Sequence, residues 1–236
     1  MVKVVTFLKR KAGMSVEDFQ RYWRTRHPEV VVRLPGVRRY VQSHTLASAY
    51  RKGEPVYDGI AEVWAADTDA LRAMTRSPEN AKVQVDEAQF IDRATMGFLV
   101  TEEQVVVEGA VAPEAVKAVE FLSRKAGASV DEFQRHWRES HAKILAGIPG
   151  LRRCVLSATR RAAYEAGRAP AHDGVTSMWF ASSDALRAAA SSPAYAAAVA
   201  DRERFLAPGQ PPFIVTQEHV IVGGAGSESA GWGRGL

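Results

Sequence analysis

Hydrophobic and polar residues alternate with two different periods along the first half of the chain. Four short runs rich in β-branched and aromatic residues predict strands. These runs cover residues 2–8, 37–46, 59–65 and 95–107. Between the first two runs, Val16, Phe19 and Trp23 recur at helical spacing. Ser15, with an acidic Asp18 three positions later, is typical of the start of a helix.

A second helical region lies between the third and fourth predicted strands. It starts near Asp69, and Ser77 followed by Pro78 is typical of a cap with proline at the first helical position. The resulting order, βαββαβ, predicts a ferredoxin-like α+β unit. A four-stranded antiparallel sheet with helices on one face leaves its other face uncovered, so we expect that face to pack against a second sheet.

The second half of the chain repeats the first. Residues 7–27 and 121–141 are identical at 14 of 21 positions, with a shift of 114. The similarity continues in three further pairs of segments, 34–43 with 148–157, 57–78 with 172–193, and 98–107 with 213–222. A duplication therefore covers nearly the whole chain.

The repeats define the expected domain organisation. We expect one ferredoxin-like repeat at residues 1–108 and a second at 117–222, joined by a linker at 109–116 that is rich in small residues. Residues 223–236 have the glycine- and serine-rich composition of a flexible tail. The two repeats would pack sheet to sheet, which predicts an α/β barrel of the dimeric type formed within one chain.

Composition narrows the class of protein. The chain of 236 residues is 46% hydrophobic and 25% charged, and its apolar runs are too short to span a bilayer. A net charge of +4 from scattered basic residues gives no reason to expect nucleic-acid binding. The first residues lack the pattern of a signal peptide, and a single cysteine, Cys154, fits a reducing compartment. We expect a cytoplasmic protein.

Several chemistries have no motif in this sequence. There is no phosphate-binding glycine loop, no G-x-S-x-G and no H-E-x-x-H, and the six histidines lack metal-ligand spacing. We therefore expect no metal. His136 and His141 are five residues apart, which would place them on different faces of a regular helix. Cys154 has no obvious base nearby and is expected to be a buried small residue.

Each repeat has a histidine four residues after a tryptophan. His27 follows Trp23 and His141 follows Trp137, so each histidine continues the apolar face of its helix. Either histidine could act as an acid or base in a cleft between helix and sheet, or could simply bond to a backbone carbonyl. Pro28, present only in the first repeat, is expected to push His27 out of the helical region.

The second predicted strand differs most between the repeats. Alternate residues of a strand point to one face. In the first repeat they are Tyr40, Gln42 and His44, and their counterparts are Cys154, Leu156 and Ala158. Polar groups are costly to bury without partners, which a bound ligand, water or an exposed sheet edge would supply. If one repeat is catalytic, it is the first.

The third predicted strand offers a second set of candidates. Glu62 and Trp64 share a face, and their counterparts are Ser177 and Trp179. The tryptophans could stack on a flat polycyclic substrate or a flavin, or could be ordinary core residues.

The residues before this strand differ in part between the repeats. Tyr57, which corresponds to His172, could border a cleft. The Asp-Gly pairs that begin at Asp58 and Asp173 fit the chemistry of a turn.

The combined motifs resemble a known family. The run K-A-G-x-S-x-x-x-F-x-x-x-W-R-x-x-H occurs at 11–27 and 125–141, and each copy is followed by Pro-Gly and by D-G-x-x-x-x-W. This pattern resembles the EthD-type branch of the dimeric α/β-barrel superfamily. That superfamily also includes cofactor-free monooxygenases, polyketide cyclases and dehydratases, haem-degrading enzymes and a hydroxynitrile lyase. Tandem chains of this length are similar to ring-opening oxygenases of angucycline antibiotic pathways.

The resemblance implies an oxygenase that modifies a polycyclic aromatic polyketide intermediate by hydroxylation, quinone formation or C–C ring cleavage. The reaction would use O2 directly or with reduced flavin, FMNH2 or FADH2, supplied by a flavin reductase. The candidate catalytic residues are His27, Tyr40, Gln42 and His44. The candidate substrate or flavin contacts are Trp23, Tyr57, Glu62, Trp64, His141 and Trp179.

Two alternatives fit the same residues. The first is a cofactor-free lyase, cyclase or dehydratase that acts on a polyketide-like substrate, and it predicts turnover without oxygen. The second is a non-catalytic barrel that holds an aromatic ligand, and it predicts binding without product. The chain would be a monomer with an internal pseudo-dimer or a homodimer.

Overall fold

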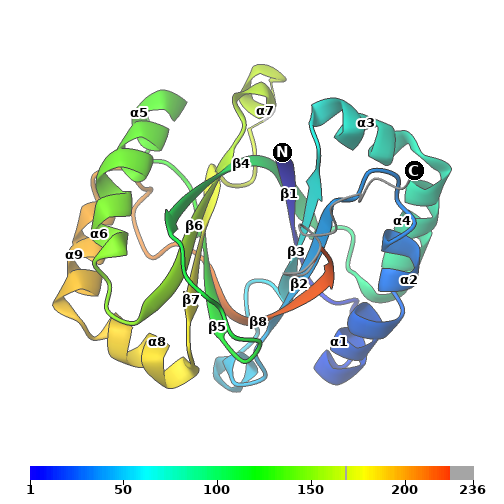
Figure 1. Cartoon of the computed structure of the whole chain (residues 1–236), viewed down its shortest axis with the longest axis horizontal. Coiled ribbons are helices and arrows are strands. Elements are labelled where there is room, and N and C mark those ends of the chain that lie inside the picture. The colour runs from blue at the N-terminus through cyan, green and yellow to red at the C-terminus, as the bar shows by residue number, and fades with distance from the viewer. Residues whose placement is uncertain (168, 224–236) are drawn as a thin grey trace, which may run out of the picture.

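A closed antiparallel barrel forms the centre of the computed structural model, which describes residues 1–167 and 169–223 (Figure 1). Its strands within these residues are β1 (Val2–Leu8), β2 (Arg39–Thr45), β3 (Gly59–Ala65), β4 (Gly97–Val107), β5 (Val116–Leu122), β6 (Leu151–Thr159), β7 (Gly174–Phe180) and β8 (Phe213–Val222). The β-branched and aromatic runs of the sequence therefore form the barrel wall, as predicted.

Helices cover two opposite flanks of the barrel (Figure 1). The first repeat supplies α1 (Val16–Thr25), α2 (Pro28–Val31), α3 (Thr68–Arg76) and α4 (Pro78–Phe90). The second supplies α5 (Val130–Arg135), the π-helix η2 (His136–His141), α6 (Ala142–Ala146), α8 (Ser183–Ala190) and α9 (Pro193–Arg202). Short helices η1 (Ala49–Lys52) and α7 (Arg161–Glu165) follow β2 and β6. The predicted α+β architecture of two ferredoxin-like repeats is confirmed.

The two sheets are joined at both edges. The strand order around the barrel is β1-β3-β2-β8-β5-β7-β6-β4. The last strand of each repeat pairs with the first strand of its own repeat and with the second strand of the other, so β4 pairs with β6 and β8 pairs with β2. Neither repeat therefore keeps a free sheet edge at these strands, and unpaired edges are a liability for association.

Strand alternation separates two environments. Residues that point outward lie beneath the helices, and residues that point inward fill the barrel lumen. The apolar part of the lumen consists of Val5, Phe7, Ile60, Leu99, Val119, Phe121, Val175 and Ile214. Charged residues of the same strands lie next to this layer.

The predicted helix starts are confirmed. The Ser15 side chain accepts a hydrogen bond from the backbone of Asp18, and Ser129 forms a complete capping box with Glu132. Ser77 caps α4, whose first residue is Pro78. These caps satisfy backbone N–H groups that have no partner inside the helix.

The ends of the duplicated segments lie near the predicted boundaries. β4 ends at Val107, just before the predicted linker, and β5 begins at Val116, which is the last residue of the predicted linker. Of the predicted tail, residues 224–236 lie outside the described residues. Among the helices that the structure describes, none combines the length and apolar character needed to cross a membrane.

Candidate active site

A hydrogen-bonded chain of buried side chains lies between α1 and β2. Trp23 Nε1 donates to the Tyr40 hydroxyl at 3.2 Å. Gln42 Nε2 donates to the same hydroxyl at 2.9 Å and to the Trp23 carbonyl at 2.7 Å. Gln42 Oε1 is 3.0 Å from His44 Nε2, and the His44 ring stacks on Trp23 with a centroid separation of 4.3 Å. Trp23, Tyr40, Gln42 and His44 therefore form one unit, which we call the β2 chain.

The β2 chain determines where its protons lie. Because the amide nitrogen of Gln42 donates to two oxygens, its Oε1 accepts from His44 Nε2–H. His44 Nδ1 then carries a lone pair. The Tyr40 oxygen accepts from Trp23 and Gln42, so its own hydrogen is available for donation. Burial raises the pKa of Tyr40, which keeps this hydroxyl protonated.

The protein itself supplies partners for the polar row. Bound ligand, water and an exposed edge were the expected sources, but Tyr40, Gln42 and His44 are buried and bond to one another and to α1. These partners are available because α1 places both the indole N–H and the backbone carbonyl of Trp23 over the strand. Sequence reasoning placed the three residues on one face correctly and missed these partners.

Among its described residues, the second repeat has no equivalent chain. Cys154, Leu156 and Ala158 are buried and apolar. Trp137 Nε1, the counterpart of the indole that bonds Tyr40, has no hydrogen-bond partner among the described residues. Burial raises the pKa of Cys154 to about 12, so this thiol stays protonated and behaves as the small buried residue that was predicted.

His27 is held by a carboxylate of α4. Its Nδ1 is 2.6 Å from Asp86 Oδ2, and the Tyr22 hydroxyl donates to Asp86 at 2.8 Å. These hydrogen bonds outweigh burial and hold the pKa of Asp86 below its ordinary value. An ionised Asp86 accepts from His27 Nδ1–H, which leaves the lone pair on Nε2. The His27 and Tyr40 rings are 6.4 Å apart.

The backbone of His27 differs from the prediction. Its φ of −56° and ψ of −35° are helical despite the following Pro28. Instead, α1 ends at Thr25, and the His27 N–H reaches back five residues to the Tyr22 carbonyl at 3.2 Å. This π-type hydrogen bond absorbs the irregularity, so the proline begins α2 without leaving His27 extended.

His141 and His136 share one partner, contrary to the expectation that they lie on different helix faces. His141 Nδ1 is 2.9 Å from Asp201 Oδ2, and His136 Nε2 is 3.0 Å from the same oxygen. They lie on η2, whose wider π-helical turn brings residues five apart onto one face. Both repeats therefore keep a histidine–aspartate pair between their helices, whereas only the first has the β2 chain.

Glu62 and Trp64 point into the lumen, on the opposite side of the sheet from the β2 chain. Glu62 Oε1 lies 2.9 Å from Lys3 Nζ, and its other oxygen bonds Lys117 Nζ. Burial alone would raise the pKa of Glu62, but the two ammonium groups hold it at about 2. Trp64 consequently cannot stack on a ligand that lies between helix and sheet.

The faces of the two lumen tryptophans are covered by cations. The pairs are Lys3–Trp64 at 5.1 Å, Arg39–Trp64 at 5.2 Å, Lys117–Trp179 at 4.7 Å and Arg153–Trp179 at 5.8 Å. Such cation–π contacts compete with stacking by a flat ligand. These two rings therefore do not fit a stacked flavin.

Tyr57 lies toward the other end of the lumen. Its hydroxyl is 2.9 Å from His172 Nε2, which is the matched position of the other repeat. Phe7 and Phe121 pack against both rings. The structure does not bring Tyr57 together with the other candidate residues.

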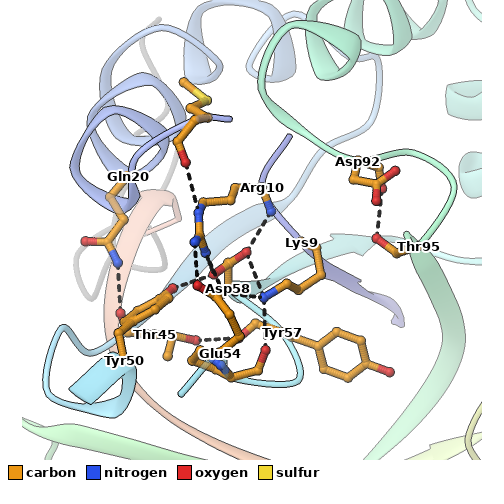
Figure 2. A network of polar contacts seen from close by, with 12 residues as sticks. Lys9, Arg10, Gln20, Thr45, Tyr50, Glu54, Tyr57, Asp58, Asp92 and Thr95 are labelled. Carbon is orange, nitrogen blue, oxygen red and sulfur yellow. Dashed lines mark hydrogen bonds and ion pairs between the residues drawn. The ribbon is translucent and has the colours of Figure 1, made fainter. Parts of the chain in front are cut away.

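A polar network that sequence reasoning assigned to a turn ties the loop before β3 to the end of β1 (Figure 2). Asp58 is fully buried and accepts from the Arg10 guanidinium at 2.7 Å and from the Tyr50 hydroxyl at 2.6 Å. The second repeat has the same network, in which Asp173 accepts from Arg124 and Tyr164. The presence of all three residue types in both repeats was the sequence signal that could have revealed this network. Its occurrence in both repeats indicates a structural role, which is to hold the loop against the strand.

Comparison with solved structures shows the same fold. An anthrone oxidase-like protein aligns with a TM-score of 0.65 and 14% identity, covering 94% of this chain and 93% of that chain. A "putative monooxygenase from Lactobacillus acidophilus NCFM" aligns with a TM-score of 0.57 and 10% identity over 94% and 96% of the two chains. A "putative chlorite dismutase" has a TM-score of 0.54 and 10% identity over 92% and 94%.

Comparison of the sequence identifies the family. No curated protein matches the chain. The EthD domain matches twice, at residues 11–94 and 125–209. These segments span more than half of the chain and fall once in each structural repeat. This protein therefore belongs to the EthD domain family.

Proposed function

We propose that this protein is an oxygenase that oxidises a polycyclic phenol or anthrone of the aromatic polyketide class with O2. The reaction would take place between helices and sheet in the first repeat. The observation that carries this proposal is the β2 chain beside His27. Within the described residues, only the first repeat combines a buried hydroxyl donor with its histidine–aspartate pair. The names of the anthrone oxidase-like and monooxygenase structures agree with this class of reaction.

Each residue has a defined role in the proposed reaction. His27 Nε2 accepts a proton from the substrate, and the Asp86 carboxylate stabilises the imidazolium that forms. The Tyr40 hydroxyl donates a hydrogen bond to the developing oxyanion. Gln42 and His44 are positioning residues, because they hold the Tyr40 oxygen and the Trp23 ring in place.

The overall reaction balances without a further reductant. An anthrone loses a proton to give an electron-rich anion, which reacts with O2. Loss of water from the resulting peroxide gives the quinone, so one O2 yields one quinone and one water. The cation-covered faces of Trp64 and Trp179 favour this direct reaction over one that uses a flavin stacked at these residues.

Oxygen consumption by the purified protein with an anthrone tests this proposal. We expect one O2 consumed per quinone formed, with no requirement for added reduced FMN or FAD. Tyr40→Phe and His27→Gln should each lower kcat by about 100-fold, the lower end of what a positioned acid or base contributes. The matched variant His141→Gln in the second repeat should retain the activity.

Other outcomes would contradict specific parts of the proposal. Product formed anaerobically would identify a lyase, cyclase or dehydratase. Dependence on reduced flavin would overturn the direct reaction with O2. Tight binding of the anthrone without turnover would favour a ligand-binding barrel. Equal losses in the His27 and His141 variants would exclude a single site in the first repeat.

A further inference from the structure

The lumen beside the apolar layer has near two-fold symmetry in its polar residues. Equivalent positions of the two repeats hold the same residue in four pairs, Lys3 with Lys117, Ser43 with Ser157, Trp64 with Trp179, and Glu103 with Glu218. The exception is Glu62, which corresponds to Ser177. Two buried lysines therefore share a single fully buried carboxylate at these positions.

In the half of the lumen that contains Glu62, the buried indole N–H and the serine hydroxyl have hydrogen-bond partners. Trp64 Nε1 donates to Glu103 Oε2 at 2.6 Å. Lys117 Nζ bonds Glu62 and also donates to Ser43 Oγ at 3.3 Å. Carboxylates thus accept the indole N–H and the ammonium protons on this side.

In the half that contains Ser177, three buried donors lack acceptors among the described residues. Ser157 Oγ, Ser177 Oγ and Trp179 Nε1 are buried and have no hydrogen-bond partner among the described residues. Their residues are only 0%, 1% and 6% exposed. They lie on the paired strands β6 and β7, where Ser177 is opposite Val155 and Trp179 is opposite Arg153. Three unpaired donors on one patch of wall are rare in proteins.

The surroundings of these donors favour an anion as their partner. Lys117 and Arg153 lie against the Trp179 ring. The nearby carboxylates already have cations, since Glu218 is held by Lys117 at 3.1 Å and Glu103, opposite Ser157, is held by Lys3 at 2.9 Å. The symmetry-related Trp64 donates to a carboxylate, and the residue missing at position 177 is itself a carboxylate. This end of the lumen reaches solvent, because the side chain of Glu103 is 30% exposed.

We propose that the barrel lumen binds the carboxylate group of an organic acid at Ser157, Ser177 and Trp179. The bound carboxylate occupies the place that Glu62 fills in the other half. It takes as its cation Lys3, which also bonds Glu103 at 2.9 Å, and Glu62 is then left to Lys117. This site lies on the opposite side of the sheet from the β2 chain, so the proposal does not depend on the proposed function.

Indole N–H signals in ¹⁵N NMR spectra test the proposal directly. Acetate is the first probe, because it has the carboxylate of the missing glutamate, and benzoate tests whether an aromatic acid also fits. Sodium chloride at equal ionic strength is the control. We expect acetate to shift the Trp179 signal in a saturable way, with Trp179→Phe used for assignment. The signal of Trp137, also unpartnered but outside the lumen, should not shift.

Thermal unfolding of variants provides an independent readout. Saturating acetate should raise the Tm of the unmodified protein by about 2–4 °C relative to chloride. Ser177→Glu should raise the Tm without acetate and abolish the acetate effect, because the new side chain fills the site. The matched control Thr176→Val removes an unpartnered buried hydroxyl of the same strand that faces the helices, and it should keep the acetate effect.

Three results would overturn the proposal. Identical behaviour in acetate and chloride would mean that the three donors bind water only. A folded Ser177→Glu protein that still responds to acetate would place the binding elsewhere. A shift of the Trp137 and Trp179 signals together would indicate a general effect of the salt. A response to acetate but not to benzoate would support the site and limit it to small aliphatic carboxylates.

Discussion

His44 is an imidazole that its surroundings keep neutral. Burial lowers its pKa to about 3, and the nearby His219 and Arg24 act in the same direction. A neutral ring can stack closely on Trp23 and donate one N–H to Gln42. The same burial makes His44 a weak base, which is why we assign proton transfer to His27 and a positioning role to His44.

The neutral state of His44 should make folding stability depend on pH. The unfolded chain binds a proton near pH 6.5 and the folded chain does not, so stability is lost as pH falls below 6.5. At pH 5 this one residue should lower the free energy of unfolding by about 2 kcal/mol relative to pH 7.5. Urea unfolding of the protein and of His44→Gln should show a shallower pH dependence in the variant. Equal dependence would mean that His44 is protonated in the folded state.

At the scale of elements, two glycines set how closely the helices approach the sheet. A Cβ on Gly59 would lie 2.5 Å from the Ser43 carbonyl oxygen and 2.6 Å from the Trp23 ring. Gly174 stands in the same relation to Trp137, with its nearest ring atom at 2.5 Å. Both tryptophans are fully buried, so each indole covers a glycine of β3 or β7.

Adding one methyl group at these positions should loosen the helix from the sheet. Gly59→Ala should lower the free energy of unfolding by about 1–3 kcal/mol, because a backbone oxygen and a buried ring must move. Gly147→Ala is the control, since its Cβ would meet only the Ile144 oxygen at 3.4 Å, and it should change stability by about 0.5 kcal/mol or less. Urea titration measures both. Equal effects of the two substitutions would contradict this account of the packing.

At the scale of the whole molecule, each repeat completes the sheet of the other. β4 and β8 each hydrogen-bond to strands of both repeats, and the lumen is filled from both sides. Lys117 of the second repeat bonds Glu62 of the first across this shared interior. The connection at residues 108–115 therefore joins two halves that also hold together through the barrel.

Cutting this connection should leave the halves associated. A protease site inserted between Val111 and Ala112, cleaved after folding, should give two fragments that elute together on size exclusion at the volume of the intact chain. The fragments should separate in urea, where the shared strand pairs are lost. Separate elution in native buffer would show that the covalent connection, and not the barrel, holds the repeats together.

The fold could be predicted from the sequence because its signals are local and occur twice. Period-two and helical spacing identified the strands and helices, serine caps identified the helix starts, and the 114-residue shift identified the two repeats. That Tyr40, Gln42 and His44 share one face of their strand followed from alternation alone. The π-helical turns at His27 and His141 could not be predicted, because regular helical spacing does not reveal an inserted residue.

Only the tertiary structure decided which polar residues meet. Alternation places Gln42 and Glu62 on faces of their own strands, but the register of β2 with β3 sets one toward the helices and the other into the lumen. The partners of His27, Glu62 and Asp58 lie 59, 55 and 48 residues away. Contacts over such distances arise from barrel closure and helix docking, and no local pattern of the chain records them.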